Sequence, residues 1–396
     1  MDFKDVLAAR ESLAQIASLT PVHHSRWLAG MTGAPVWMKC ENFQRTGSFK
    51  IRGAYLRISR MPGAERAKGV VAASAGNHAQ GVALAARELG AKATIFMPEG
   101  AAIPKVDATR AYGADVRFAG EHIGTALVAA QEFAKETGAT FIHPFDHQDI
   151  VIGQGTVGPE IIEQVPDVDT ILVPVGGGGL IAGISLLRQE RPDVKIIGVQ
   201  TEKAASYSQA FAKGYPVEIE LGVTMADGIA VGRPGDIPFE LVSQYVDEVI
   251  TVQEESISTA LMLLLERAKL LVEPSGAVGV AAILENPGRF NKTTVPVLSG
   301  GNIDSIVLLQ VVRHGLVAAG RFLNFRVRIP DRPGELMQLL AHLASMDVNV
   351  QNVTHDRTSA ALGVGETGVQ LQVATRGIEH REDVMAEIKN LGYLTY

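Results

Sequence analysis

The strongest constraint on the fold of this chain is an alternation of short apolar runs and helical stretches that begins at Val70. Unbroken apolar runs are typical of parallel strands covered on both faces. Strands are expected at Val36–Cys40, Val70–Ala73, Ala93–Met97, Asp115–Phe118, Thr140–Ile142, Thr170–Val175, Lys195–Val199, Val249–Val252 and Thr294–Leu298, and helices at Val6–Ser18, Gln80–Leu89, Thr125–Glu136, Leu180–Glu190 and Glu254–Leu271. The alternation predicts an α/β fold with open, mostly parallel sheets.

The pattern changes after Gly320 and predicts a second domain over residues 325–396. A strand that alternates apolar and basic residues is followed by a leucine-rich helix, two more alternating strands, a second helix and the terminal L-T-Y. The order βαββαβ is that of a small ferredoxin-like module. We therefore expect a first domain over residues 1–320, with a small lobe at about 45–145 and a large lobe from the remainder, and a boundary at 320–325.

The composition excludes several classes of protein. The net charge of −7 and the pI of about 5.8 argue against binding to nucleic acid or to an anionic membrane. Cys40 is the only cysteine, which excludes an intramolecular disulfide and a cysteine-based zinc site. The sequence has no signal-peptide pattern and no apolar run of membrane-spanning length, so we expect a cytoplasmic protein with no membrane segment.

The stretch Glu41–Ala54, E-N-F-Q-R-T-G-S-F-K-I-R-G-A, places Lys50 just after a polar turn. The turn predicts a helix start, with Ser48 as its N-cap. The positive end of the helix dipole and burial both lower the pKa of a lysine in this position. The free amine that results is the form that attacks an aldehyde. Taken alone, a lysine that opens a helix is usually a solvated structural residue, so the catalytic interpretation depends on the other motifs.

Two small-residue turns follow expected strands, where open α/β sheets bind ligands. In S-A-G-N-H-A-Q-G, Ser74–Gly81, backbone N–H groups at a helix start favour a carboxylate, and the Asn77 amide suits a ring hydroxyl. A plain N-cap turn is the alternative, and His78 is expected to be packed or capping. In G-G-G-G-L, Gly176–Leu180, the N–H groups form a phosphate cup.

The glycine turn has a competing interpretation. Gly177, Gly179 and Ala182, with Glu202 further on, also match a relaxed dinucleotide-binding pattern. That pattern would make the chain an oxidoreductase, and it leaves the Lys50 stretch unexplained.

Two further turns complete the pattern. S-G-G-N, Ser299–Asn302, follows the last expected strand, and its serine can give one neutral hydrogen bond to a heteroaromatic nitrogen. Asp227 and Glu273 are candidate site carboxylates or helix caps.

Together these motifs resemble the fold-type II pyridoxal-phosphate enzymes, and among them the threonine/serine dehydratases. The Lys50 stretch, the Asn77 turn, the glycine turn and S-G-G-N occur in the order found in that family. The resemblance covers about residues 15–320 and implies a two-lobed fold like that of the tryptophan synthase β subunit. It also implies pyridoxal 5'-phosphate as the cofactor.

The resemblance assigns roles position by position. Lys50 would be the catalytic Schiff-base lysine, and Ser299 would face the pyridine nitrogen. The other implied contacts are Phe49 as a wall beside the cofactor, Asn77 at its ring hydroxyl, Gly176, Gly177, Gly178, Gly179 and Leu180 at its phosphate, and Ser74, Ala75, Gly76, Asn77 and His78 at the substrate carboxylate.

The implied reaction is the β-elimination of L-threonine to 2-oxobutanoate and ammonia by a carbon–nitrogen lyase, with L-serine as a second substrate. A serine racemase, or a dehydratase for another β-hydroxy amino acid such as 3-hydroxyaspartate, is the alternative. Related racemases place a second serine where this chain has Ala75, and carboxylate ligands for a divalent cation where it has Gln200 and Ser206. We therefore expect no metal site. A third hypothesis is an inactive amino-acid sensor.

The tail, with D-R-P-G-E-L at Asp331–Leu336, resembles an ACT domain, a regulatory module that binds amino acids. The resemblance implies a homodimer or homotetramer whose activity responds to an amino-acid effector such as isoleucine or valine. A plain dimerisation module is the alternative. His342, His355 and His380 are scattered and are expected to be solvated or capping.

Overall fold

The computed structural model describes residues 1–357 and 362–395. The chain divides into two compact units, Met1–Val307 and Leu308–Tyr396. The division falls inside helix α15 (Ser305–Ala318), ahead of the boundary expected at 320–325. Across the described residues, no helix is both long enough and apolar enough to cross a bilayer.

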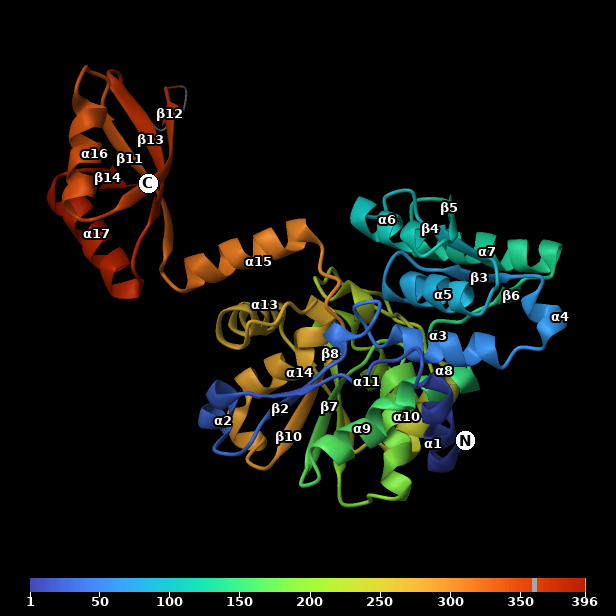
Figure 1. Ribbon diagram of the computed structural model, residues 1–396. Helices are drawn as coiled ribbons and strands as arrows, with labels where there is room; N and C mark the ends of the chain where they lie inside the picture. The colour runs from blue at the N-terminus through green and yellow to red at the C-terminus, as the bar shows by residue number, and fades with distance from the viewer. Residues whose placement is uncertain (358–361, 396) are drawn as a thin grey trace. The chain divides into compact units, whose positions relative to one another are not determined.

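The small lobe of the first unit contains a four-stranded parallel sheet with the order β5-β4-β3-β6 (Figure 1). Its elements are β3 (Val70–Ala73), α5 (Asn77–Glu88), β4 (Ala93–Met97), α6 (Ile103–Ala111), β5 (Asp115–Phe118), α7 (Ile123–Thr137) and β6 (Thr140–Phe141). Every residue of β3 is buried, as expected for a central strand covered on both faces. The predicted strands of this lobe are confirmed.

The large lobe contains a six-stranded sheet with the order β1-β2-β10-β7-β8-β9. Its strands are β1 (Val22–His24), β2 (Trp37–Cys40), β7 (Thr170–Pro174), β8 (Lys195–Thr201), β9 (Glu248–Val252) and β10 (Thr294–Leu298). Only β1 pairs antiparallel with its neighbour. The strand β10, from the far end of the unit, therefore lies between β2 and β7.

Helices complete the first unit. They are α1 (Phe3–Leu13), α2 (Arg26–Thr32), α3 (Lys50–Ser59), α4 (Gly63–Arg66), α8 (Gln148–Gly155), α9 (Val157–Gln164), α10 (Gly179–Ser185), α11 (Ser206–Lys213), α12 (Asp236–Tyr245), α13 (Glu254–Leu263) and α14 (Pro274–Glu285).

Three helix boundaries differ from expectation. The first helix starts at Phe3 because the Asp2 side chain caps it. The helix expected over Leu180–Glu190 ends at Ser185 and continues as a 3-10 turn. The helix expected over Glu254–Leu271 ends in a π-turn, after which Lys269 has a φ of 60°.

The second unit has the predicted βαββαβ order. Its elements are β11 (Phe322–Pro330), α16 (Glu335–Ser345), β12 (Asn349–Asp356), β13 (Glu366–Ala374), α17 (Ile378–Asn390) and β14 (Leu394–Thr395). They form an antiparallel sheet with the order β12-β13-β11-β14, and Val327, Val369 and Leu371 lie in its core. Tyr396 of the terminal L-T-Y lies outside the described residues.

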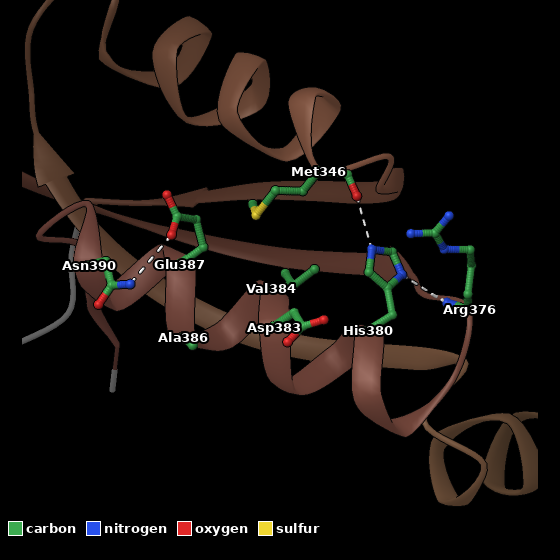
Figure 2. A pocket seen from close by; sticks show the side chains of 8 residues that line it. All are labelled: Met346, Arg376, His380, Asp383, Val384, Ala386, Glu387 and Asn390. Atoms are coloured by element: carbon green, nitrogen blue, oxygen red, sulfur yellow. Dashed lines mark hydrogen bonds between the residues drawn. The ribbon is translucent and has the colours of Figure 1, made fainter.

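A pocket on this unit is lined by one face of α17 and the turn at Met346 (Figure 2). His380 connects the two sides, because its Nε2 donates to the carbonyl of Met346 at 2.9 Å and its Nδ1 accepts from the Arg376 N–H at 3.1 Å. No residue of Asp331–Leu336 lines the pocket, so the D-R-P-G-E-L turn lies elsewhere on the unit.

Candidate active site

Lys50 is the first residue of α3, but Ser48 does not cap the helix. Phe49 occupies the cap position with helical backbone angles, and the buried Ser48 hydroxyl has no hydrogen-bond partner among the residues that the structure describes. The backbone before Lys50 pairs instead with the loop after β10, since Phe49 N–H donates to Ser299 O at 3.2 Å and Ser48 pairs with Gly300. A long-range pairing therefore replaces the predicted local cap.

The Lys50 amine lies in a largely apolar setting. Its Nζ donates to the carbonyl of Pro144 at 3.0 Å and lies 5.2 Å from the centre of the Phe49 ring. Burial lowers the pKa of Lys50 to about 8, and the opposing attraction of Glu273 is smaller. The amine is therefore far more available as a base or nucleophile than that of an ordinary lysine.

Hydrogen bonds join the segments that the sequence singled out. Asn302 Nδ2 donates to Asn77 Oδ1 at 2.8 Å and to Thr46 O at 2.7 Å. Asn77 Nδ2 in turn donates to Glu273 Oε1 at 2.7 Å. Glu273 N–H donates to Gly300 O at 3.0 Å. The Lys50 stretch, the Asn77 turn, the S-G-G-N loop and the start of α14 thus meet at one place.

The two candidate carboxylates differ. Glu273 is buried, makes no side-chain cap bond to α14, and has its pKa raised to about 7 by burial. Asp227 is exposed and pairs with Lys105 at 3.0 Å. Of the two, Glu273 belongs to the buried group around Asn77.

The Ser74–His78 turn presents backbone rather than a basic side chain. Ser74 Oγ accepts from the Gly76 N–H at 3.2 Å, and α5 begins at Asn77. The His78 ring is buried, and its Nε2 donates to Ile142 O at 2.8 Å. Burial lowers the pKa of His78 to about 3, so the ring stays neutral, as expected of a packed histidine.

The glycine turn joins β7 to α10 under tight packing. A Cβ on Gly177 would lie 2.5 Å from the Phe145 ring, and one on Gly178, whose φ is +97°, would collide with the Tyr207 hydroxyl. Glycine is therefore required at both positions. Within the described part of the chain, the N–H groups of Gly177 and Gly178 have no hydrogen-bond partner, so they are available to an anion.

The segment H-P-F-D, residues 143–146, is a part of the site that sequence reasoning missed. Pro144 accepts from Lys50, and the Phe145 ring supports the glycine turn. The Asp146 carboxylate accepts from two N–H groups at the start of α12, at 3.1 and 3.0 Å. The available signal was its position directly after an expected strand, as for the other turns.

The side chains of Gln200 and Ser206 form a hydrogen bond with each other beside the glycine turn. Gln200 Nε2 donates to Ser206 Oγ and to Val175 O, both at 3.3 Å, and Gln200 Oε1 accepts from the Tyr207 N–H at 3.1 Å. Both side chains are buried. No carboxylate occupies either position.

The pyridoxal-phosphate dependent enzyme family matches residues 13–300, a range that includes Lys50, the Asn77 turn, the glycine turn and Ser299. The chain belongs to this family. Its lysine, its glycine turn and its serine loop therefore lie in a pyridoxal-phosphate enzyme fold, and the dinucleotide interpretation of Gly177 and Gly179 is wrong.

Members of this family with similar sequences or structures cover most of the chain. An L-threonine ammonia-lyase of Geobacter sulfurreducens is 47% identical over 98% of this chain and 96% of its own. The processed form of threonine deaminase isoform 2 from Solanum lycopersicum superposes with a TM-score of 0.76 and 37% sequence identity, over 78% of this chain and 91% of its own. Maize serine racemase superposes with a TM-score of 0.74 and 36% sequence identity, over 80% of this chain and 98% of its own.

The lowered pKa of Lys50 predicts an unusual pH dependence in the cofactor-free protein. Modification of Lys50 by a small amine reagent, followed by mass spectrometry, should rise with pH through a midpoint near 8, because the free amine forms above the pKa. Glu273→Gln should lower that midpoint further, since the carboxylate favours the charged amine. Asp227→Asn is the matched control and should leave it unchanged. A midpoint near 10.5 in the parent would contradict the prediction.

Proposed function

We propose that the protein is a threonine ammonia-lyase, which converts L-threonine to 2-oxobutanoate and ammonia and accepts L-serine as a second substrate, giving pyruvate. The observation that carries the proposal is the nearly full-length match to an L-threonine ammonia-lyase at 47% identity. The convergence of four segments at Lys50 supports it.

Lys50 is proposed as the catalytic residue. Its Nζ would hold the cofactor and, once free, would accept the proton from the substrate α-carbon. Bound pyridoxal phosphate supplies an electron sink for the electrons of the broken bond. The lowered pKa of the amine supports this role, because a base must be unprotonated to accept a proton.

The other residues fit the cofactor's functional groups. Within the described residues, the N–H groups of Gly177 and Gly178 have no partner, which supports a phosphate site at the Gly176–Leu180 turn. Asn77, whose amide bonds Glu273 and Asn302, is proposed to bond the ring hydroxyl. Among the described residues the Ser299 hydroxyl has no hydrogen-bond partner, which leaves it available to the pyridine nitrogen. Phe49 would form a wall beside the ring.

The Ser74–His78 turn is proposed to receive the substrate carboxylate through its backbone. Ala75 has no hydroxyl to move a proton on the opposite face, which favours elimination over racemisation. The likeness to maize serine racemase keeps racemisation as the second candidate. The Gln200–Ser206 pair, which offers no anionic ligand, counts against it.

A product assay on the holoenzyme tests the proposal. L-threonine should give 2-oxobutanoate and ammonia, L-serine should give pyruvate more slowly, and D-serine should not accumulate. Accumulation of D-serine, or turnover of 3-hydroxyaspartate in preference to threonine, would overturn the assignment.

We also propose that the second unit is an ACT-type regulatory module in a homodimer or homotetramer. Its βαββαβ order and the D-R-P-G-E-L turn that leads into α16 support this. Gly334 caps α16 with a φ of +98° and makes no side-chain cap bond, and the N–H groups at this helix start are the proposed site of an effector carboxylate.

Isoleucine or valine is therefore expected to change threonine turnover by the full-length enzyme. Gly334→Val should weaken the response, because a β-branched residue strains that backbone angle. Gly392→Val is the matched control, since it imposes similar strain at a φ of +83° on another turn of the same unit. Turnover indifferent to every amino acid tested, or an equal response in Gly334→Val, would contradict the regulatory role.

A further inference from the structure

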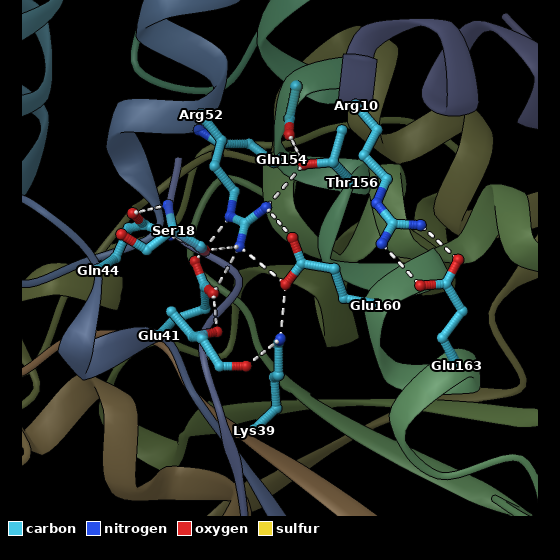
Figure 3. Close-up of polar contacts among 12 residues, drawn as sticks. Arg10, Ser18, Lys39, Glu41, Gln44, Arg52, Gln154, Thr156, Glu160 and Glu163 are labelled. Carbon is cyan, nitrogen blue, oxygen red and sulfur yellow. Dashed lines mark hydrogen bonds and ion pairs between the residues drawn. The ribbon is translucent and has the colours of Figure 1, made fainter. Parts of the chain in front are cut away.

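A buried ionic cluster surrounds Arg52 of α3 (Figure 3). Arg52 follows Lys50 by two residues, which places it about 200° around the helix. The cluster consists of Lys39, Glu41, Arg52 and Glu160, all buried. Its two cations balance its two carboxylates.

The Arg52 guanidinium uses every N–H it has. Its Nε and Nη2 donate to the two oxygens of Glu41, each at 2.8 Å. Its Nη1 donates to Glu160 Oε1 at 2.6 Å and to Thr156 Oγ1 at 3.1 Å, and Nη2 also reaches Ser18 O at 3.3 Å. Such a planar, multiply bonded group fixes direction as well as distance.

Lys39 extends the cluster into the large lobe. Its Nζ donates to Glu160 Oε2 at 2.6 Å, to Gln164 Oε1 at 2.9 Å and to Thr20 O at 2.8 Å. Burial alone would raise the pKa of Glu41, but Arg52, Lys39 and Thr20 together outweigh it and lower that pKa. The carboxylate therefore stays charged, and the cluster ties α3 to β2 and α9.

Stability does not explain this arrangement, because apolar residues of similar volume often replace a buried ion cluster without loss. In the contact between α3 and α8 beside it, Gly53 faces the Gln154 side chain and the backbone of Gly153. A Cβ on Gly153 of α8 would lie 2.6 Å from Gly53 Cα of α3, so backbone packs on backbone. Rotation of α3 about its axis is therefore opposed by the directional bonds of Arg52, together with the burial of Ile51 and Leu56 in the core.

We propose that Arg52 is a positioning residue, which sets the rotation of α3 and so the place of Lys50 Nζ in the site. The proposal rests on the proposed role of Lys50. A displacement of the reacting amine by about 1 Å is enough to cost about 100-fold in rate.

The test uses the double variant Arg52→Met/Glu41→Gln in the full chain. It removes one cation and one anion, so the Lys39–Glu160 pair at 2.6 Å remains balanced. Arg52→Lys is the second variant, which keeps the charge but not the planar set of donors. Arg10→Met is the matched control, since Arg10 pairs with Glu163 on α9 at the exposed edge of the same region (Figure 3).

In the folded double variant, kcat for threonine should fall about 100-fold while KM changes less than about threefold. The pH midpoint for modification of Lys50 in cofactor-free protein should rise from near 8, because a displaced amine is better solvated. Arg52→Lys should show intermediate changes in both quantities, and Arg10→Met should show neither.

If a folded Arg52 variant keeps the parent's kcat for threonine and the parent's pH midpoint for modification of Lys50, the proposal is overturned. Loss of the folded state in both Arg52 variants also overturns it, because Arg52 would then be needed for the fold itself. A parent enzyme without threonine turnover would refute the proposed function instead, and the Lys50 midpoint would still report the effect of Arg52.

Discussion

Replacing Lys50 with alanine is expected to reduce threonine turnover by at least about 1,000-fold while the fold survives. The amine is the proposed base, and no other amine takes part in the hydrogen bonds that join the described parts of the site. The change removes only one hydrogen bond, to Pro144, and one contact with the Phe49 ring. Stability should therefore change little.

Formation of 2-oxobutanoate by matched amounts of parent and variant measures the effect, and circular dichroism checks the fold. Lys292→Ala is the control, because that lysine makes only an exposed pair with Asp169. A small primary amine added to the Lys50→Ala enzyme should restore part of the rate. Full activity of Lys50→Ala would refute the assignment of the catalytic residue.

The second large effect is expected from Gly183→Ala, in the contact between α8 and α10. A Cβ on Gly183 would lie 2.5 Å from the N and 2.7 Å from the Cα of Gly155, and would collide with Val151 O. These are all backbone atoms, so the two helices must separate. We expect a loss of about 3 kcal/mol or more in the free energy of unfolding.

For a unit that spans Met1–Val307, that loss corresponds to a fall in Tm of about 5 °C. Because α10 begins at the glycine turn, the affinity for pyridoxal phosphate should fall as well. Gly30→Ala is the matched control: it also lies within a helix, α2, but a Cβ there has nothing within 4 Å. Alanine at that position should be neutral or stabilising by up to about 1 kcal/mol. Equal Tm values for the two variants would disprove the role of the contact.

The sequence predicted the strands well because burial leaves a strong local pattern. Strands such as Val70–Ala73 and Ala93–Met97 are short apolar runs with clear ends, and the structure has them at those bounds. The convergence of Lys50, Asn77 and Ser299 was expected only from the resemblance to a known family, because Asn77 follows β3 of the four-stranded sheet and Ser299 follows β10 of the six-stranded one.

Features decided by distant residues were not predictable. Ser48 has the composition of an N-cap, but its backbone pairs with Gly300, and nothing near Ser48 in the sequence indicates that partner. The role of Arg52 was not predictable either, although Arg52 lies in the same motif as Lys50. Its ion pair with Glu160 joins it to another helix, far away in the sequence. The glycines at 153 and 183 are visible in the sequence, but the backbones they contact are not.

The place of β10 in the large sheet also has a consequence for synthesis on the ribosome. Without β10, the pair β1–β2 cannot join β7, β8 and β9, so the sheet remains in two pieces until residues 294–298 emerge. The strands of the small lobe, by contrast, all lie within residues 70–141 and can pair early, because their contacts are close in sequence. A nascent chain that stops before Thr294 exposes the unpaired edges of β2 and β7, which invite aggregation. It also lacks Ser299, so the site assembles only after nearly the whole unit has been made.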